Sequence, residues 1–465
     1  MDSDRIKHLL KSSQSKKAEY ILYFLQQAQR YEYNHALAFA IEEANNYNLP
    51  LIVYFGFTGN YPEANLRHYT FMAEGLIELA NKFELKGIHF EIIYDEPDKG
   101  IIPFLEKAKT VVMDIGYTKI QRQWRKNIYQ EILLNHPQID LYSVESDSII
   151  PVVLVSDKEE YGAYTIRRKL YDFLPRFSST LLIPTIQNKT MIFQKRHYDS
   201  VEELLKPINI NKSIPASFYY HGGYTEAKKW ITAFISSKLI HYEQSNDPSK
   251  DLTSKMSMYL HFGQISSLEI YHLVKNSSVS EKIKDAFIEQ LFVRRELAHN
   301  FVFYNPNYDE FESITTPWAY LTMINHQNDI KEYTYSKNDY IHFKTHDIYF
   351  NSAMKEMVYT GYMHNYMRMY WAKKIIEWST SYKEAYEIIK DLNNTFFIDG
   401  RDALSYTGIA WCFGKHDRAW AERNIFGKIR YMNSSGLTRK FDILEYVRQM
   451  NLFEQTTTYH NETSV

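Results

Sequence analysis

The segment GYMHNYMRMYWAKKIIEW, Gly361–Trp378, is followed closely by DLNNTFFIDGRDALSYTGIAW, Asp391–Trp411. In the first segment, apolar residues recur at the spacing of an amphipathic helix that packs into a core. The stripe consists of Met363, Met367, Trp371, Ile375 and Trp378. Arg368 lies on the same side, and a cation at such a place is costly unless it is paired. Asp399 in the DGRD turn is the natural partner, so we expect the two segments to meet.

Helical spacing extends on both sides of these segments, from Tyr224 to about Asn451. Within it, Ser381 followed by Glu384 is a capping-box signal that predicts the start of a helix over Tyr382–Leu392. We therefore expect an all-helical domain over residues 224–453 and a polar tail over residues 454–465.

The first third of the chain has a different pattern, in which short apolar runs alternate with helix-like segments. The predicted strands are Glu19–Leu25, Leu49–Phe57, Ile88–Tyr94, Thr110–Ile115 and Ile139–Glu145, and the intervening helices include Ala36–Asn45 and Asn65–Leu85. Nearly continuous apolar strands that alternate with helices predict a doubly wound parallel sheet. We expect this α/β domain over residues 17–172, and a long linker that is punctuated by prolines over residues 173–223.

Composition limits the classes of function. The 465 residues include 54 Lys and Arg against 56 Asp and Glu, so contact with a nucleic acid would need a local basic patch. The single cysteine, Cys412, excludes an internal disulfide and a cysteine metal cluster. His342 and His346 are four residues apart, but HFKTH lacks the glutamate of a zincin motif, and no metal site is predicted. No run reaches the ~18 apolar residues of a membrane span, so we expect a soluble, intracellular protein.

A nucleotide site, if present, is expected in the helical half. The chain has no Walker loop and no GxGxxG motif after a strand, which argues against a Rossmann-type site. Thr253, Ser254 and Ser257 open the segment SKMSMYLHFGQIS, Ser254–Ser266. Hydroxyls and N–H groups at a helix start can bind an anion, although Ser and Thr also serve as simple N-caps.

A series of motifs resembles the class II cyclobutane pyrimidine dimer photolyases of the photolyase/cryptochrome family. Besides the segments quoted above, they are RRELAHNFVFYNPNYDEFES (Arg294–Ser313), KTHD (Lys344–Asp347), HDRAWAERNIFGKIRYM (His416–Met432) and RKFD (Arg439–Asp442). The resemblance implies an antenna-type α/β domain, a long linker and a helical domain that binds FAD. It also implies ultraviolet-damaged DNA as the partner, and we expect a monomer.

The resemblance implies the residues that hold FAD. Arg368 and Asp399 would pair beside the isoalloxazine ring, with the carboxylate receiving the flavin N3–H. Asn393, expected just past the end of its helix, would lie opposite flavin N5. The other residues carried over are Thr253, Ser254 and Ser257 at the pyrophosphate, together with Tyr242, Arg401 and Asp402. A second, antenna pigment such as a deazaflavin is possible in the α/β domain, although QQAQR (Gln26–Arg30) replaces the acidic run that the family tends to show there.

The resemblance also implies a site for damaged DNA, because the family flips the dimer out of the duplex into a pocket above the flavin. Flipping requires a stacking wall, polar contacts and a group that fills the gap. Trp411 matches the wall, Met369 matches a pocket residue, and Arg430 matches the arginine that fills the gap. Asn246 and Arg294 match polar contacts to the lesion or its backbone. Around Arg430, the basic residues are Arg423, Lys428, Arg439 and Lys440.

Two residues depart from the family pattern. Gln290 stands where the family usually has a glutamate that hydrogen-bonds the dimer, and glutamine cannot supply a proton. Phe350 stands where we expect the middle tryptophan of an electron-hopping chain whose other members match Trp371 and Trp378. Phenylalanine is harder to oxidise, so the electron would need another route, for example through Tyr349 or Tyr335. Flavin photoreduction is thereby in doubt, whereas repair starts from reduced flavin.

The expected function is blue-light-driven repair of cyclobutane pyrimidine dimers by a deoxyribodipyrimidine photo-lyase that uses reduced, anionic FAD. Two alternatives remain open because of Gln290 and Phe350. One is a light-sensing flavoprotein that does not repair DNA, and the other is repair of a different photoproduct. A plain binding or structural protein would lack flavin.

Overall fold

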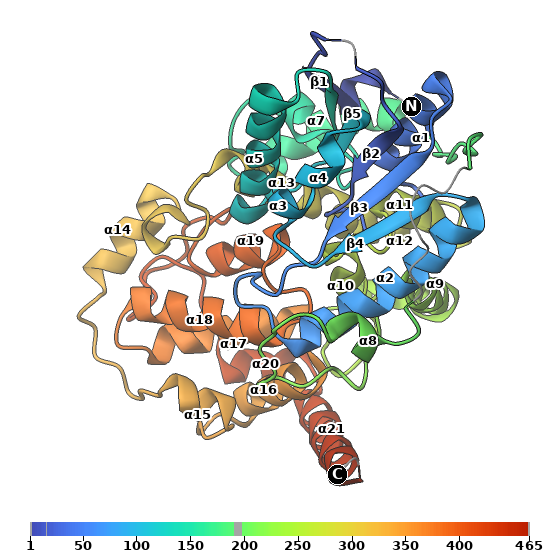
Figure 1. Ribbon diagram of the computed structural model, residues 1–465. Helices are drawn as coiled ribbons and strands as arrows, with labels where there is room; N and C mark the ends of the chain where they lie inside the picture. The colour runs from blue at the N-terminus through green and yellow to red at the C-terminus, as the bar shows by residue number, and fades with distance from the viewer. Residues whose placement is uncertain (1, 15, 190–197, 464–465) are drawn as a thin grey trace.

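The computed structural model describes residues 2–14, 16–189 and 198–463. Its N-terminal part is built on a six-stranded sheet with the strand order β1-β6-β5-β2-β3-β4. The strands are β1 (Ile6–Leu10), β2 (Tyr20–Phe24), β3 (Leu51–Gly56), β4 (His89–Ile93), β5 (Ala108–Asp114) and β6 (Asp140–Val144). The five strands from β2 to β6 pair in parallel. Every residue of β2 and β3 is buried, because helices cover both faces of the sheet. The predicted doubly wound sheet is confirmed (Figure 1).

Helices connect and cover these strands. They are α1 (His35–Tyr47), α2 (Leu66–Lys86), α3 (Pro97–Gly100), α4 (Ile102–Leu105), α5 (Lys119–Asn135), α6 (Val152–Val155), α7 (Ala163–Phe177) and α8 (Val201–Leu205). Local sequence sets their ends: Asn65 and His68 form a capping box at the start of α2, and Gly87, with φ 72°, ends it in the left-handed region. Residues 190–197 of the predicted linker lie outside the described residues.

From Tyr224 on, the described residues are mainly helical, as predicted. The helices are α9 (Tyr224–Ala233), α10 (Ser257–His261), α11 (Ser267–Lys275), α12 (Glu281–Ile288), the π-helical turn η4 (Glu289–Arg294), α13 (Arg295–Tyr304), α14 (Pro317–Asn325), α15 (Lys337–Ile341), α16 (Ile348–Thr360), α17 (Asn365–Trp378), α18 (Tyr382–Phe396), α19 (Ala403–Cys412), α20 (Ser434–Lys440) and α21 (Ile443–Thr463). The predicted apolar stripe is buried in the core that α16–α19 share. No helix of the described residues is both long and apolar enough to cross a membrane.

Three elements differ from the sequence-based expectation. The edge strand β1 pairs antiparallel with β6 and lies before residue 17; its exposed residues Lys7 and His8 hide it from a search for apolar runs. Met363 lies outside α17, because Gly361 ends α16 with φ 81°. The described backbone of the predicted tail continues α21 to Thr463.

Arg67 ties the α/β part to the helices of the site. Its guanidinium donates to the backbone carbonyls of Phe396 (3.0 Å), Met357 (3.3 Å) and Val358 (2.7 Å). These carbonyls lie near the C-terminal ends of α18 and α16, where the last carbonyls of a helix have no intrahelical donor and carry partial negative charge. Burial lowers the pKa of Arg67 to about 10. One side chain of α2 therefore fixes the ends of α16 and α18, and α18 carries the candidate cofactor residue Asn393.

Candidate cofactor and nucleic-acid site

Arg368 and Asp399 form the predicted pair. Arg368 Nη1 lies 3.0 Å from Asp399 Oδ1, and Arg368 Nε donates to the Met363 carbonyl at 2.9 Å. The guanidinium also lies 4.0 Å from the centre of the Phe397 ring, a cation–π distance. Residues from α17 and from the turn after α18 therefore meet although they are far apart in sequence.

Asp399 is held in its charged form. Burial raises the pKa of this carboxyl, but the Arg368 charge and hydrogen bonds from Ser257 and Arg368 outweigh burial, and the pKa lies below its ordinary value. An ionised carboxylate only accepts hydrogen bonds. Asp399 can therefore receive an N–H from a ring that binds beside the pair.

Asn393 is buried in the last turn of α18, not past the end of the helix as the sequence suggested, because α18 continues to Phe396. Its Nδ2 donates to Asn394 Oδ1 at 2.9 Å. Its Oδ1 forms no hydrogen bond with any described residue. Asn393 thus offers a free acceptor to a bound group.

The predicted phosphate segment lies beside the same pair. Ser257, the first residue of α10, contacts Asp399, and Tyr362 Oη donates to Thr253 Oγ1 at 3.1 Å. Ser254 Oγ accepts weakly from the Met256 N–H at 3.4 Å. These hydroxyls are half-buried, so that they remain accessible to an anion.

Tyr242 is half-buried between aromatic rings, with its ring centre 5.2 Å from Phe287 and 6.0 Å from Phe234. Burial raises its pKa to about 12, so it stays protonated and can donate. Asn246, four residues later, is exposed, and the preceding Ser245 carbonyl accepts from His364 Nε2 at 2.9 Å if that nitrogen carries the proton.

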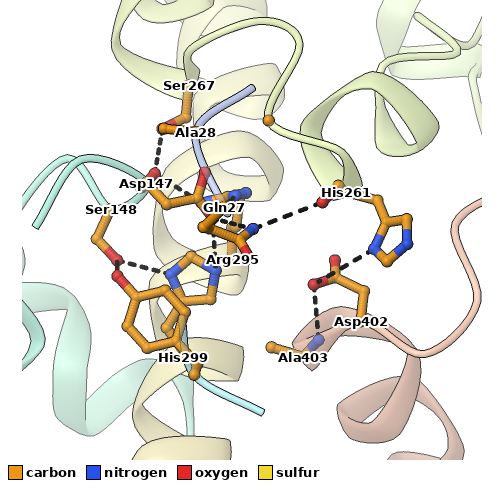
Figure 2. Close-up of polar contacts among 12 residues, drawn as sticks. Gln27, Ala28, Asp147, Ser148, His261, Ser267, Arg295, His299, Asp402 and Ala403 are labelled. Carbon is orange, nitrogen blue, oxygen red and sulfur yellow. Dashed lines mark hydrogen bonds and ion pairs between the residues drawn. The ribbon is translucent and has the colours of Figure 1, made fainter. Parts of the chain in front are cut away.

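Arg401 and Asp402 occupy different surroundings from Asp399. Arg401 is buried with φ 63°, and its Nη1 lies 2.9 Å from His68 Nε2 in the α/β part. Asp402 accepts from the Ala403 N–H at 2.7 Å at the start of α19 and lies 3.9 Å from His261 (Figure 2). The Arg401 guanidinium thus lines a cavity toward the sheet, a position that the sequence did not reveal.

Trp411 and Gly408 share one face of α19. Trp411 is half-buried, and Gly408, one turn earlier, is exposed. A Cβ atom on Gly408 would meet nothing within 4 Å. Glycine weakens a helix interior by about 0.5–1 kcal/mol relative to alanine. At Gly408 this cost comes with open space beside the Trp411 ring on the same face of α19.

Arg430 lies beside Trp411. Its guanidinium is 5.3 Å from the centre of the Trp411 ring and 4.3 Å from that of Trp420. Asp417 holds it, with Arg430 Nε 2.9 Å from Asp417 Oδ2. Arg423, on the same loop, is exposed and lies 4.0 Å from the Tyr431 ring centre.

Gln290 and Arg294 are exposed on η4. Arg294 pairs with Glu289 at 3.1 Å, and its charge contributes to lowering the pKa of His416, which burial lowers most, to about 4. Arg294 therefore lies close to the loop that carries Asp417 and Arg430. Met369, half-buried on α17, directly follows Arg368.

Comparison with known proteins identifies the family. Residues 21–187 match the sequence profile of DNA photolyase. Over 448 residues the chain is 42% identical to a deoxyribodipyrimidine photo-lyase of Methanothermobacter thermautotrophicus, covering 96% of this chain and 97% of that protein. The chain belongs to the photolyase/cryptochrome family.

Solved structures of low sequence identity share the photolyase fold. A cryptochrome from Synechocystis sp. PCC6803 has a TM-score of 0.72 at 14% identity, covering 94% of this chain and 89% of that one. A photolyase from Sulfolobus tokodaii, described with two FAD molecules and a novel light-harvesting cofactor, has a TM-score of 0.67 at 18% identity, covering 93% and 89%.

This photolyase-family chain has a cavity at the carboxyl ends of its parallel strands, and its empty space of about 650 Å³ includes open solvent. Its lining includes Gln27, Gly56, His68, Trp124, His261 and Arg401. In the sheet β2 lies between β3 and β5, and the chain crosses from the edge strand β4 back to β5, so the strand order reverses between β2 and β5. Ligands of open α/β sheets bind at such a switch point. The sequence suggested a pigment in this half without naming residues.

A buried polar network lies next to this cavity and joins the two halves of the photolyase fold (Figure 2). Arg295 Nη2 lies 2.7 Å from Asp147 Oδ2, and Gln27 Nε2 donates to the same oxygen at 3.3 Å. Ser148 Oγ lies 2.7 Å from His299 Nδ1. Arg295 and His299 come from α13, so the helical half is fixed against the loop after β6.

Replacing Lys373 by methionine is expected to stabilise the fold at pH 7 by about 1–3 kcal/mol. Lys373 is fully buried on α17, and its Nζ donates to the Cys412 carbonyl at 2.5 Å. Burial lowers its pKa from 10.5 to about 8, a cost of about 3 kcal/mol at neutral pH; losing the carbonyl's donor offsets part of the gain.

Urea unfolding at pH 7 and pH 10 checks this prediction. Between pH 8 and 10.5 the unfolded chain binds the Lys373 proton more tightly than the folded chain, so the stability of the natural protein rises with pH there. K373M should lack this rise. The exposed control K383M should retain it, and a K373M protein that is less stable at pH 7 would contradict the prediction.

Proposed function

We propose that this chain is a class II deoxyribodipyrimidine photo-lyase that uses reduced FAD and blue light to split cyclobutane pyrimidine dimers in DNA. The observation that carries the proposal is the Arg368–Asp399 pair in the helical half, together with the free acceptor of Asn393, six residues before Asp399. The family relationship and the photo-lyase name of the Methanothermobacter relative support it.

The residues present fit a flavin. Asp399, held ionised, accepts an N–H of the isoalloxazine ring, and Arg368 supplies a positive charge beside it. Asn393 Oδ1 provides a second acceptor, while Thr253, Ser254 and Ser257 present hydroxyls for the pyrophosphate. When bound, reduced FAD supplies an electron to the dimer on excitation and recovers it after the ring splits. The protein's task is to position and to tune these partners.

The other side of the site fits flipped DNA. Trp411 supplies the stacking wall, and the open space at Gly408 leaves room for a base beside it. To contact DNA, Arg430 must break its ion pair with Asp417. The guanidinium can then bind a phosphate or enter the gap that the flipped dimer leaves. Arg294 and Arg423 add local positive charge to a chain whose net charge is −2.

We also propose that the cavity at the strand ends holds a second, light-harvesting aromatic cofactor. Its walls include the apolar side chains of Trp124, Phe57 and Met72 and the amides of Gln26 and Gln27. Apolar walls with a few polar groups are typical of cofactor sites. Absorbance of the purified protein beyond the flavin bands, lost in a variant with Trp124→Ala that removes a ring from the cavity wall, would support this; an unchanged spectrum would contradict the site.

The decisive experiment measures the loss of dimers from ultraviolet-irradiated DNA with the purified, chemically reduced protein, in blue light and in the dark. Loss in light alone is the expected result. No loss with FAD bound and reduced would favour a light-sensing flavoprotein, which the exposed Gln290 and the Phe350 substitution motivate. Loss of a different photoproduct would instead favour the other alternative.

Gln290→Glu is expected to raise the repair yield per absorbed photon by about two- to fivefold, because a carboxyl group can supply a proton that glutamine cannot. Gln290 is exposed on η4, so the change should leave stability within 0.5 kcal/mol, as roughly expected for surface substitutions. The matched control is Glu289→Gln, whose carboxylate instead pairs with Arg167 and Arg294. An unchanged yield in Gln290→Glu would show that glutamine does not limit repair.

A further inference from the structure

Asn393 can present either end of its amide to a bound ring, and the two ends favour different ligands. The oxygen accepts a hydrogen bond, whereas the NH₂ group donates. The hydrogen bonds to neighbouring groups decide which end of the amide faces which side. Here Asn393 Nδ2 donates to Asn394 Oδ1 at 2.9 Å, which leaves Asn393 Oδ1 free.

Asn394 is fixed from both sides. Its Oδ1 accepts from the Arg401 backbone N–H at 3.0 Å, and its Nδ2 donates to the Glu63 carboxylate. A carboxylate only accepts and a backbone N–H only donates, so a flipped Asn394 would lose both hydrogen bonds. With Asn394 Oδ1 committed, Asn393 can approach it only through Nδ2.

The two residues that hold Asn394 adopt strained backbone conformations. Glu63 has φ 59° and Arg401 has φ 63°, in the left-handed region that side chains with a Cβ rarely adopt. Such strain costs on the order of 1–3 kcal/mol per residue and persists where surrounding structure requires it. Arg401 Nη1 also donates to the Asn394 carbonyl. Two residues with strained backbones, one from each half of the fold, therefore hold Asn394, which is fully buried.

We propose that Asn394 is a positioning residue, anchored by Glu63 and the Arg401 backbone, that turns Asn393 Oδ1 toward flavin N5. The inference rests on the proposed function. Flavin N5 carries a hydrogen only when the ring is reduced, whereas oxidised N5 is an acceptor and would need a donor. The fixed amide thus makes the site bind reduced FAD more tightly than oxidised FAD, which is the form that repair requires.

This arrangement assigns a role to the α/β half at the catalytic centre. Glu63 lies on the loop between β3 and α2, and Asn65 on the same loop donates to the Thr395 carbonyl at 2.7 Å. The side chains of Asn65 and Glu63 therefore dock this loop against the last turn of α18. Glu63 acts through Asn394 on Asn393, the residue that is proposed to face flavin N5.

The test compares the dissociation constants of oxidised and of chemically reduced FAD, measured in the dark, without DNA. In Asn394→Leu, the preference for reduced FAD should fall at least tenfold, because Asn393 is free to flip. In Glu63→Ala, a milder change on an exposed residue, it should fall about threefold. The matched control Glu106→Ala removes an exposed carboxylate of the same half and should leave the preference unchanged.

The outcomes separate this inference from the proposed function. An unchanged preference in a folded Asn394→Leu protein would overturn the role of Asn394. If that variant does not fold, Glu63→Ala alone decides, and a preference equal to that of Glu106→Ala would overturn the proposal. Failure of the natural protein to bind FAD would instead contradict the proposed function, and FAD binding without light-dependent repair would leave the positioning test intact.

Discussion

Replacing Arg368 by methionine is expected to lower the free energy of unfolding by about 3–5 kcal/mol and to weaken FAD binding at least a hundredfold. The variant leaves the buried Asp399 carboxylate without its cation, and an unpaired buried charge carries a cost of about that size. It also removes the positive charge that would face a reduced, anionic flavin. Thermal or urea unfolding and titration with FAD measure the two effects.

A second variant separates stability from binding. The double change Arg368→Met with Asp399→Leu removes both charges, and apolar pairs often replace buried ion pairs at little cost. Stability should therefore return to within about 1–2 kcal/mol of the natural protein, while FAD binding stays lost. Recovery of binding in the double variant would contradict the role of the pair.

The same pair predicts a dependence on pH. Because the pKa of Asp399 is lower in the folded protein than in the unfolded chain, its contribution to stability is present above the unfolded value of 3.8 and disappears as the pH falls below it. This acid-induced loss should be smaller in the double variant.

Tyr335→Phe is expected to slow photoreduction of the bound flavin at least tenfold, whereas Phe350→Trp should accelerate it by a similar factor. Phe350 lies 5.1 Å from the centre of the Trp378 ring, at the position where an oxidisable ring is missing. Tyr335 lies 5.3 Å from Trp378, and its hydroxyl is 2.7 Å from His346 Nδ1. The histidine can take the hydroxyl proton when the tyrosine is oxidised.

The matched control is Tyr349→Phe. Tyr349 was an equal candidate from the sequence, but no ring contact joins it to Trp378 among the described residues. Flavin absorbance under blue light with an external reductant follows the rate in each variant. Equal rates in Tyr335→Phe and the natural protein would exclude Tyr335, and repair from chemically reduced protein should be unchanged in all three variants.

The elements that were predicted correctly carry strong local signals. Five of the six strands lie in short, mostly apolar runs, and Ser381 caps α18 as its spacing with Glu384 indicated. The edge strand β1 was missed because the exposed polar residues Lys7 and His8 interrupt its apolar run, and it is held by its pairing with β6. The pairing of Arg368 with Asp399 was accessible because a lone cation on an apolar face requires a partner.

The sequence by itself determined the family, the alternation of strands and helices, and the residue types of the site, since periodicity and motifs are local properties. Only the tertiary structure decided that Arg401 faces the cavity at the sheet, that Tyr335 rather than Tyr349 touches Trp378, and that Glu63 reaches Asn394. Glu63 and Asn394 are separated by 331 residues. No local pattern encodes such a contact, because it exists only once both halves of the chain have packed and fixed which polar groups can satisfy one another.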